Sequence, residues 1–242
     1  PTLKFGTPNA KLKKMTKRLG VRLSTFTLPA GYTCPGAKDC LAFADRKTGK
    51  VTDGEGTLFR CFMASAEARS PSLRNAVWHN LELIRKALKD SVKACADLIQ
   101  NSLPKKFDVL RVHVGGDYFS EKYLQAWIEI AKQNPEKIFY SYSKSLGFIN
   151  KYALPSNLVV TASRGGKYDD LIDLHAWKEA LVVYSESEAA ELGLEIDHDD
   201  SHAAFGSENF ALLIHGTQPK GSRASQALQD IKRQQKQLAL AA

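Results

Sequence analysis

Three of the four cysteines fall in one region of the chain, and clustered cysteines in a reducing compartment more often bind metal or do redox chemistry than form disulfides. Cys34 and Cys40 lie in the segment LPAGYTCPGAKDC (28–40), and twenty residues separate Cys40 from Cys61. Structural zinc sites usually use cysteine pairs two to four residues apart, whereas iron–sulfur clusters accept looser loops. We therefore expect Cys34, Cys40 and Cys61 to hold a 4Fe–4S cluster, with one iron open to a substrate or cofactor.

Other interpretations of these three cysteines stay open. They are a zinc site completed by a histidine, thiols that bind nothing, and a disulfide, which a reducing cytoplasm disfavours. Cys95 differs because it falls on the apolar stripe of a predicted helix, where a thiol acts as a small hydrophobe. We expect Cys95 to lie outside the ligand set.

A second chemical signal is the segment HVGGDYF (113–119), which follows a predicted strand. Gly115 and Gly116 would let a ligand approach the backbone closely, because they lack side chains. Asp117 can accept hydrogen bonds from an ammonium group. This segment therefore predicts a small-molecule pocket beside the cysteines.

Further polar residues follow other predicted strands. Lys144 and Arg164 suit the carboxylate or phosphate of a bound ligand. His113 and His215 can complete a metal shell or act as acid or base. The acidic and histidine-rich segment DHDDSHA (197–203) could bind a divalent metal or cap the start of a helix. We favour the cap, since Asp is a good N-cap residue.

The hydrophobic pattern provides a scaffold that can bring these residues together. Short runs rich in β-branched and aromatic residues alternate with helical patterns, which is typical of parallel strands joined by right-handed crossovers. We predict an α/β fold whose parallel sheet of about six strands forms a partial (β/α) barrel, with ligands at the carboxyl ends of the strands. The predicted strands are Val21–Leu28, Val109–Val114, Ile138–Ser143, Leu158–Ala162, Leu181–Ser185 and Phe210–His215.

The helical pattern is clearest after Pro71, where an apolar stripe runs without interruption to Ile99 and predicts one long helix. Ser120 is the expected N-cap of a second helix. The connection between Ser143 and Leu158 is short, so its helix must be brief. We predict three parts: a basic N-terminal segment (1–20), one α/β domain (21–219) and a basic C-terminal helix or tail (220–242).

The 242-residue chain has a formal net charge of +8, and much of the excess lies at its two ends. Basic ends suit a polyanion, so nucleic acid is a candidate partner; solvated tails are the alternative. No apolar run approaches the roughly 20 residues that span a bilayer, and the N-terminus lacks the apolar region of a signal peptide. We expect no membrane association and a cytoplasmic location. The basic residues are Lys11, Lys13, Lys14, Lys17 and Arg18, and Lys220, Arg223, Lys232, Arg233 and Lys236.

Two family resemblances accompany these patterns. The cysteine loop after the first strand and the Gly-Gly-acidic tip after the second are similar to those of radical S-adenosylmethionine enzymes, which implies S-adenosylmethionine as a possible second cofactor. The cysteine spacing departs from that family's C-x₃-C-x₂-C. The chain also resembles the phage- and plasmid-borne gene product 88-like domain family, which implies a bacterial host cytoplasm. The stretches that carry this second resemblance are LPAGYTCPGAKDCLAFADRKTGKVTDG, FRCFMASAEARSPSLRNAVWHN, RVHVGGDYFS, AWIEIAKQNP and IDHDDSHA.

Two functional hypotheses follow. The first is an iron–sulfur protein with a radical-SAM-like fold, either an enzyme or a cluster carrier, whose cluster lies beside a small-molecule pocket. The alternative is a nucleic-acid-binding phage accessory protein with a structural zinc or no metal. The sequence names neither a substrate nor an oligomeric state.

Overall fold

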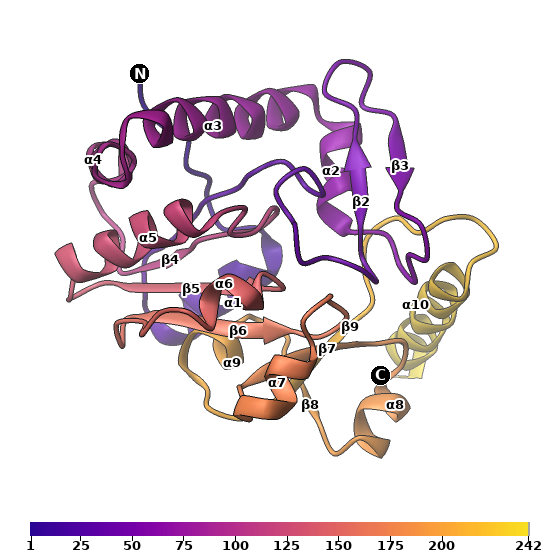
Figure 1. The fold of residues 1–242 in the computed structure, drawn as a ribbon. Helices are drawn as coiled ribbons and strands as arrows, with labels where there is room; N and C mark the ends of the chain where they lie inside the picture. The colour runs from indigo at the N-terminus through magenta and orange to yellow at the C-terminus, as the bar shows by residue number, and fades with distance from the viewer. Residues whose placement is uncertain (242) are drawn as a thin grey trace.

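Seven parallel strands form one curled sheet, a half-barrel, in the computed structural model (Figure 1), which describes residues 1–241. Their order across the sheet is β1-β4-β5-β6-β7-β9-β8. This arrangement confirms the predicted α/β fold and partial barrel, and β8 is a strand that the pattern did not predict because it has only two residues. The strands are β1 (Leu23–Thr25), β4 (Val109–Arg111), β5 (Ile138–Ser143), β6 (Leu158–Ser163), β7 (Glu179–Val183), β8 (Glu195–Ile196) and β9 (Phe210–Leu213).

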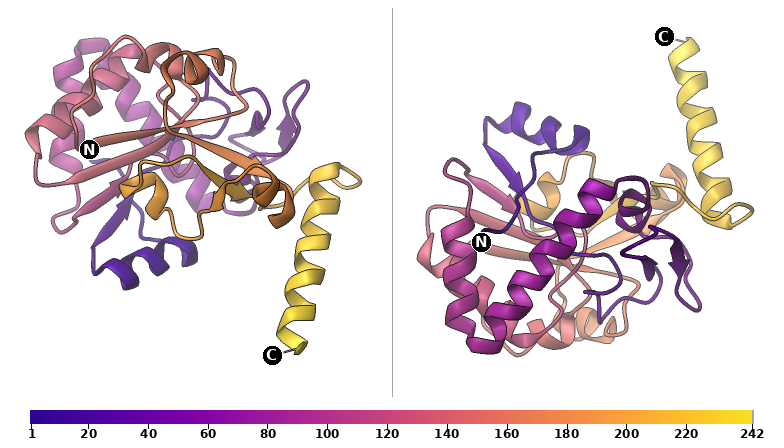
Figure 2. Two further views of the ribbon diagram at one scale, coloured as in Figure 1. Left: turned by 90° about the horizontal axis from the view of Figure 1, so that it is seen from below. Right: turned by 90° about the horizontal axis from the view of Figure 1, so that it is seen from above.

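Helices cover both faces of the sheet (Figures 1 and 2). The outer face packs against α3 (Pro71–Asp90), α4 (Val92–Ser102) and α5 (Glu121–Gln133), and Trp127 is fully buried in this core. The opposite face, which we call the inner face, packs against α1 (Ala10–Leu19) and α9 (Ser201–Phe205) in a smaller core. Successive side chains of each strand point to opposite faces of the sheet, so alternate residues reach the outer core and the inner core.

The long connection between β1 and β4 carries the three clustered cysteines. After β1 the chain forms a loop, then an antiparallel hairpin of β2 (Ala42–Ala44) and β3 (Val51–Asp53), and then α2 (Phe62–Arg69). Ala37 in the loop forms an isolated β-bridge with Gly166, beyond the end of β6. The loop therefore crosses the carboxyl edge of the sheet.

The apolar stripe from Pro71 to Ile99 belongs to two helices, so the prediction of one long helix is wrong. Ser91 is extended (φ −171°, ψ 167°), and its Oγ accepts a hydrogen bond from the Ala94 amide. A serine in this conformation satisfies an otherwise unpaired amide at the start of α4, which makes the break favourable. Periodicity alone cannot detect such a break, because the stripe continues across it.

The shorter elements largely follow the pattern. Ser120 caps α5 by accepting from the Tyr123 amide, as predicted. The helix between β5 and β6 is brief, with four residues. The remaining helices are α6 (Leu146–Ile149), α7 (Asp170–His175), α8 (Glu186–Glu191) and α10 (Arg223–Ala241).

The two basic ends differ in how they meet the body. In α1, Leu12 and Met15 are fully buried against the inner face, so this helix is part of the fold. In contrast, α10 projects away from the body (Figure 2). Ala242, the last residue of the predicted C-terminal segment, lies outside the described residues. No helix within residues 1–241 has the length and apolar character needed to cross a bilayer.

Candidate functional site

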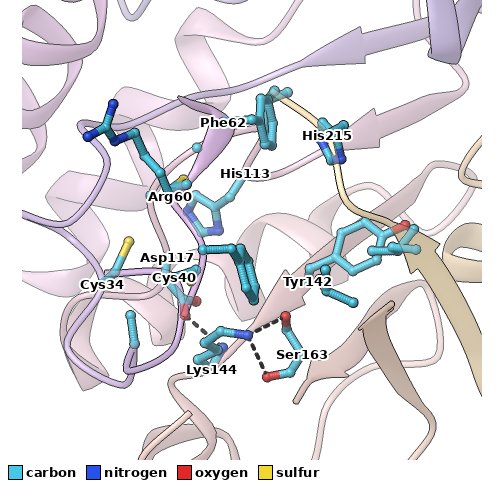
Figure 3. A pocket seen from close by; sticks show the side chains of 18 of the residues that line it. Cys34, Cys40, Arg60, Phe62, His113, Asp117, Tyr142, Lys144, Ser163 and His215 are labelled. Atoms are coloured by element: carbon cyan, nitrogen blue, oxygen red, sulfur yellow. Dashed lines mark hydrogen bonds between the residues drawn. The ribbon is translucent and has the colours of Figure 1, made fainter. Parts of the chain in front are cut away.

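A cavity of about 290 Å³ lies on the inner face at the carboxyl edge of the sheet (Figure 3). Its walls come from the loop after β1, the ends of β4, β5 and β9, and the start of α1. Figure 3 shows Cys34 and Cys40 on one side of this pocket and Tyr142 and His215 on the other. Such an edge is where parallel α/β sheets place their ligand sites.

The three clustered cysteines all line this pocket, and the fourth does not. Cys34 and Cys40 come from the loop after β1, and Cys61 is the residue before the first turn of α2. Each of the three is half-buried and is a free thiol. Cys95 is fully buried in the outer core, as expected for a packing residue.

Burial makes these thiols weak acids. It raises the pKa of Cys61 to about 12, although the amides of Ala64 and Met63 at the start of α2 oppose the shift. Burial also raises the pKa of Cys34 well above its usual value, and Asp117 and the other two thiols add to this effect. The pKa of Cys40 is raised by burial and lowered by nearby Lys144. A bound metal would reverse this balance, since a coordinating thiol loses its proton.

Asp117 lies in the pocket wall, 4% exposed, and ties the end of β4 to the end of β5. Its Oδ1 accepts hydrogen bonds from Ser143 Oγ (2.6 Å) and the Tyr118 amide (2.7 Å). Its Oδ2 accepts from the amides of Lys144 (2.8 Å) and Ser145 (3.1 Å). Both oxygens are thus engaged by the protein in this conformation, and an ammonium partner for Asp117 stays a prediction.

The two glycines before Asp117 also line the pocket, and the protein itself fills the space that their side chains would take. A Cβ on Gly115 would lie 2.0 Å from Met63 Cγ, and one on Gly116 would lie 2.5 Å from Thr33 Oγ1. Gly116 also has a left-handed backbone (φ +82°), which favours glycine. Close packing by α2 and the cysteine loop therefore explains both glycines.

Of the two predicted basic residues, only Lys144 lines the pocket. Its Nζ donates to Ser163 Oγ (2.7 Å) and to the carbonyl of Arg164 (2.7 Å). The Arg164 side chain instead pairs with Asp173 and Glu179 and is not part of the pocket wall. These two carboxylates hold the Arg164 side chain away from the pocket.

Both predicted histidines reach the pocket. His113 is 3% exposed, and its Nε2 lies 3.1 Å from the Tyr123 hydroxyl, whereas its Nδ1 has no hydrogen-bond partner among the described residues. Burial, with a contribution from Arg111, lowers the pKa of His113 to about 3, so the ring is neutral at pH 7. His215 packs on Phe62 with ring centroids 4.8 Å apart.

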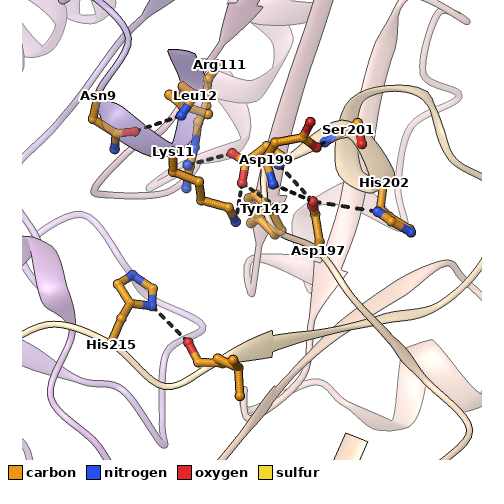
Figure 4. A network of polar contacts seen from close by, with 12 residues as sticks. Asn9, Lys11, Leu12, Arg111, Tyr142, Asp197, Asp199, Ser201, His202 and His215 are labelled. Carbon is orange, nitrogen blue, oxygen red and sulfur yellow. Dashed lines mark hydrogen bonds and ion pairs between the residues drawn. The ribbon is translucent and has the colours of Figure 1, made fainter. Parts of the chain in front are cut away.

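The pocket contains a buried ion cluster that the sequence did not reveal (Figure 4). Asp200, 1% exposed, accepts from Arg111 (2.7 Å) and pairs with Lys11 (2.7 Å). The hydroxyls of Tyr140 (3.0 Å) and Tyr142 (3.2 Å) donate to the same carboxylate. Burial alone would raise the pKa of Asp200, but Arg111 and Lys11 lower it below the ordinary value. The carboxylate is therefore charged and saturated.

The carboxylates of the segment containing Asp200 bind backbone amides at and just before the start of α9, and the N-cap residue does not cap the helix as was expected. Asp197 Oδ1 accepts from the amides of Asp199 and Asp200, and Asp199 Oδ1 accepts from the Ser201 amide. Asp200 itself makes no side-chain cap. One signal pointed to its role: Arg111 is the only charged residue in the predicted strand Val109–Val114, and a charge on a buried strand needs a partner.

No group of three or more His, Cys, Asp and Glu side chains among residues 1–241 is arranged to hold a metal ion.

Comparison with known proteins shows a phage family. The profile of the family described as gene product 88 matches residues 2–236. The Gene 88 protein of Mycobacterium phage L5 is 28% identical over 123 residues, which cover 47% of this chain and 44% of that protein. The Gene 88 protein of Mycobacterium phage D29 is 29% identical over 120 residues, with 47% and 43% covered. The matched region thus spans less than half of each relative. No solved structure matches the chain.

Proposed function

We propose that this chain, which belongs to the gene product 88 family, binds an iron–sulfur cluster through Cys34, Cys40 and Cys61. The main support is that three thiols from two separate segments line one pocket, while Cys95 lies in the core. A four-iron cluster on three thiolates would supply an open iron for redox or Lewis-acid chemistry in this pocket.

Thiolates are the usual ligands of iron–sulfur clusters, and Cys34, Cys40 and Cys61 provide three of them on one pocket. None of these cysteines is paired at the two- to four-residue spacing that structural zinc sites usually use. Lys144 and the amides of Met63 and Ala64 favour the charged form of Cys40 and Cys61. Such charges and amide dipoles stabilise sulfur ligands of clusters.

Residues around the thiols would hold them in place. Glu67 of α2 is fully buried, and its Oε1 accepts from the Ala30 amide (2.8 Å), which fixes the cysteine loop against the helix that begins after Cys61. Asp117 fixes Lys144 beside Cys40. For S-adenosylmethionine the fit is poorer, since Asp117 has no free oxygen for the ammonium group. Our proposal is therefore limited to the cluster.

The test is anaerobic purification followed by an absorption spectrum and iron and sulfide analysis. We expect a brown protein with iron and sulfide, and loss of both in Cys34→Ser, Cys40→Ser and Cys61→Ser. Cys95→Ser is the matched control, because it removes a thiol outside the pocket and should keep the cluster. A colourless, iron-free wild-type protein, or loss of iron in Cys95→Ser, would overturn the proposal.

Nucleic-acid binding is the second candidate, and the projecting helix α10 favours it. Lys232, Arg233 and Lys236 are exposed on this helix. Phosphate contacts release counterions, so binding of this kind weakens steeply as salt rises. A zinc-containing, iron-free protein with salt-dependent DNA or RNA binding would support this candidate over the cluster, and absent or salt-insensitive binding would exclude it.

A further inference from the structure

The pocket has a second end, away from the thiols, built around the buried ion cluster. We call it the cationic end and define it by Lys11, Arg111 and Asp200, all of which line the pocket. These three residues come from α1, β4 and the start of α9. Segments far apart in the sequence therefore build one site (Figure 4).

The cationic end carries a net positive charge. Lys11 and Arg111 contribute two positive charges against the single carboxylate of Asp200. The neighbouring His113 ring is neutral. In addition Asn9, the N-cap residue of α1, also lines the pocket, so the positive end of the helix dipole lies at this wall. One negative charge on a ligand would balance these three residues; the carboxylate of Asp197, which also acts on Arg111, is not part of the pocket wall.

Donor groups remain free at this end. Arg111 uses its Nε for the carbonyl of His113 and its Nη1 for Asp200, and its Nη2 has no hydrogen-bond partner among the described residues. Lys11 has three hydrogens on Nζ and pairs only with Asp200 in the described chain. The buried Nδ1 of His113 also lacks a partner among the described residues, and it is a donor when Nε2 accepts from the Tyr123 hydroxyl. Buried polar atoms are normally satisfied, so an unpartnered one in a pocket wall points to a ligand.

The free donors are held in fixed positions. The Arg111 guanidinium lies over the Tyr142 ring, 5.0 Å from its centroid. Asp200 keeps a left-handed backbone (φ +70°), which few residues other than glycine, Asn and Asp adopt. Its four partners maintain it there, so the cationic end is organised before any ligand arrives.

We propose that the cationic end binds an oxyanion, the carboxylate or phosphate of a small molecule, between Lys11, Arg111 and His113. A guanidinium and an ammonium group are the usual partners of such anions. Anion binding does not require the cluster. That the anion belongs to a molecule whose other end reaches Cys34, Cys40 and Cys61 rests on the proposed function.

The test compares two lysines of the same helix. Lys11→Gln removes a positive charge from the pocket, whereas Lys14→Gln removes one from the exposed side of α1. The two variants therefore have the same net charge. Isothermal titration with inorganic pyrophosphate and with succinate, at constant ionic strength, measures the dissociation constant. We expect saturable binding of at least one anion, weakened about tenfold by Lys11→Gln and unchanged by Lys14→Gln. The anion that binds distinguishes a phosphate from a carboxylate ligand.

Two results would overturn the inference: no saturable binding of either anion, or equal binding by wild type and Lys11→Gln. Circular dichroism of each variant shows that it is folded. The same titration on Cys34→Ser separates the two proposals. If that variant binds the anion with wild-type affinity while the wild type contains no iron, only the cluster proposal fails. If iron is present and no anion binds, only this inference fails.

Discussion

Replacement of Asp200 by Asn is the sharpest test of the buried ion cluster. Asn has nearly the shape of Asp and tolerates the left-handed backbone at this position (φ +70°), so the change removes the charge and little else. Arg111, whose side chain is 11% exposed, then loses the one carboxylate it pairs with among residues 1–241. The variant therefore isolates the free energy of leaving a buried guanidinium unpaired.

The expected loss can be worked from the contacts. Removing one partner of a buried ion pair costs about 3–5 kcal/mol. The pair with Lys11 adds under about 1 kcal/mol, because the Lys11 side chain is 34% exposed. Tyr140 and Tyr142 donate to different oxygens of Asp200, so one hydroxyl keeps an acceptor in Asn while the other faces the amide NH₂ and can accept from it. We expect a total loss of about 3–6 kcal/mol, a large part of the usual domain stability of about 5–15 kcal/mol.

Urea unfolding followed by circular dichroism measures this loss at pH 7. Asp97→Asn is the control, because its pair with Lys93 on α4 is exposed and should change stability by at most about 0.5 kcal/mol. Since the folded-state pKa of Asp200 is lowered, its stabilisation is present above the unfolded pKa and is lost as pH falls through the folded value. The difference between wild type and Asp200→Asn should therefore shrink in acid. A loss below about 1 kcal/mol at pH 7 would refute the reasoning.

Three further predictions concern other parts of the fold. Burial raises the pKa of Glu67 from 4.5 to about 7, so the folded state should lose roughly 3 kcal/mol of stability as pH rises from about 4.5 through 7. Urea unfolding at pH 5 and pH 8 should show that Glu67→Gln loses less stability than the wild type over this range. Equal losses in the two proteins would contradict this. Gly115→Ala would place a Cβ 2.0 Å from Met63 Cγ, and a thermal melt should show about 1–3 kcal/mol of destabilisation; an unchanged midpoint would mean that α2 yields easily. Ser91→Ala removes the cap of α4 and should cost about 1 kcal/mol in urea unfolding, whereas Ser91→Asn should keep most of it.

Where the sequence predicted the fold correctly, local pattern and global packing agreed. β5 was predicted with the bounds that the structure has, and β6 differed by one residue, because both are apolar runs bounded by polar loops. The antiparallel hairpin of β2 and β3 was missed, since its three-residue strands are too short to show alternation.

The site could be predicted only in part, for a physical reason. The thiols of Cys34, Cys40 and Cys61 line one pocket, and residue type and loop position were enough to select them. Arg111 and Asp200 are 89 residues apart and pair only through the tertiary fold, so no local pattern connects them. Conversely, Arg164 follows its strand as predicted but is drawn outward by carboxylates on α7 and β7.

The place of α1 in the fold has a consequence for how the protein is made. Arg18 of α1 pairs with Asp199 across 181 residues, and Lys11 meets Asp200 just beyond. During synthesis α1 leaves the ribosome well before its charged partners, which follow only after eight strands, β1 to β8, have been translated. Contacts of such long range form slowly. A nascent or truncated chain would therefore lack the cationic end, so anion binding there would report that folding has reached completion.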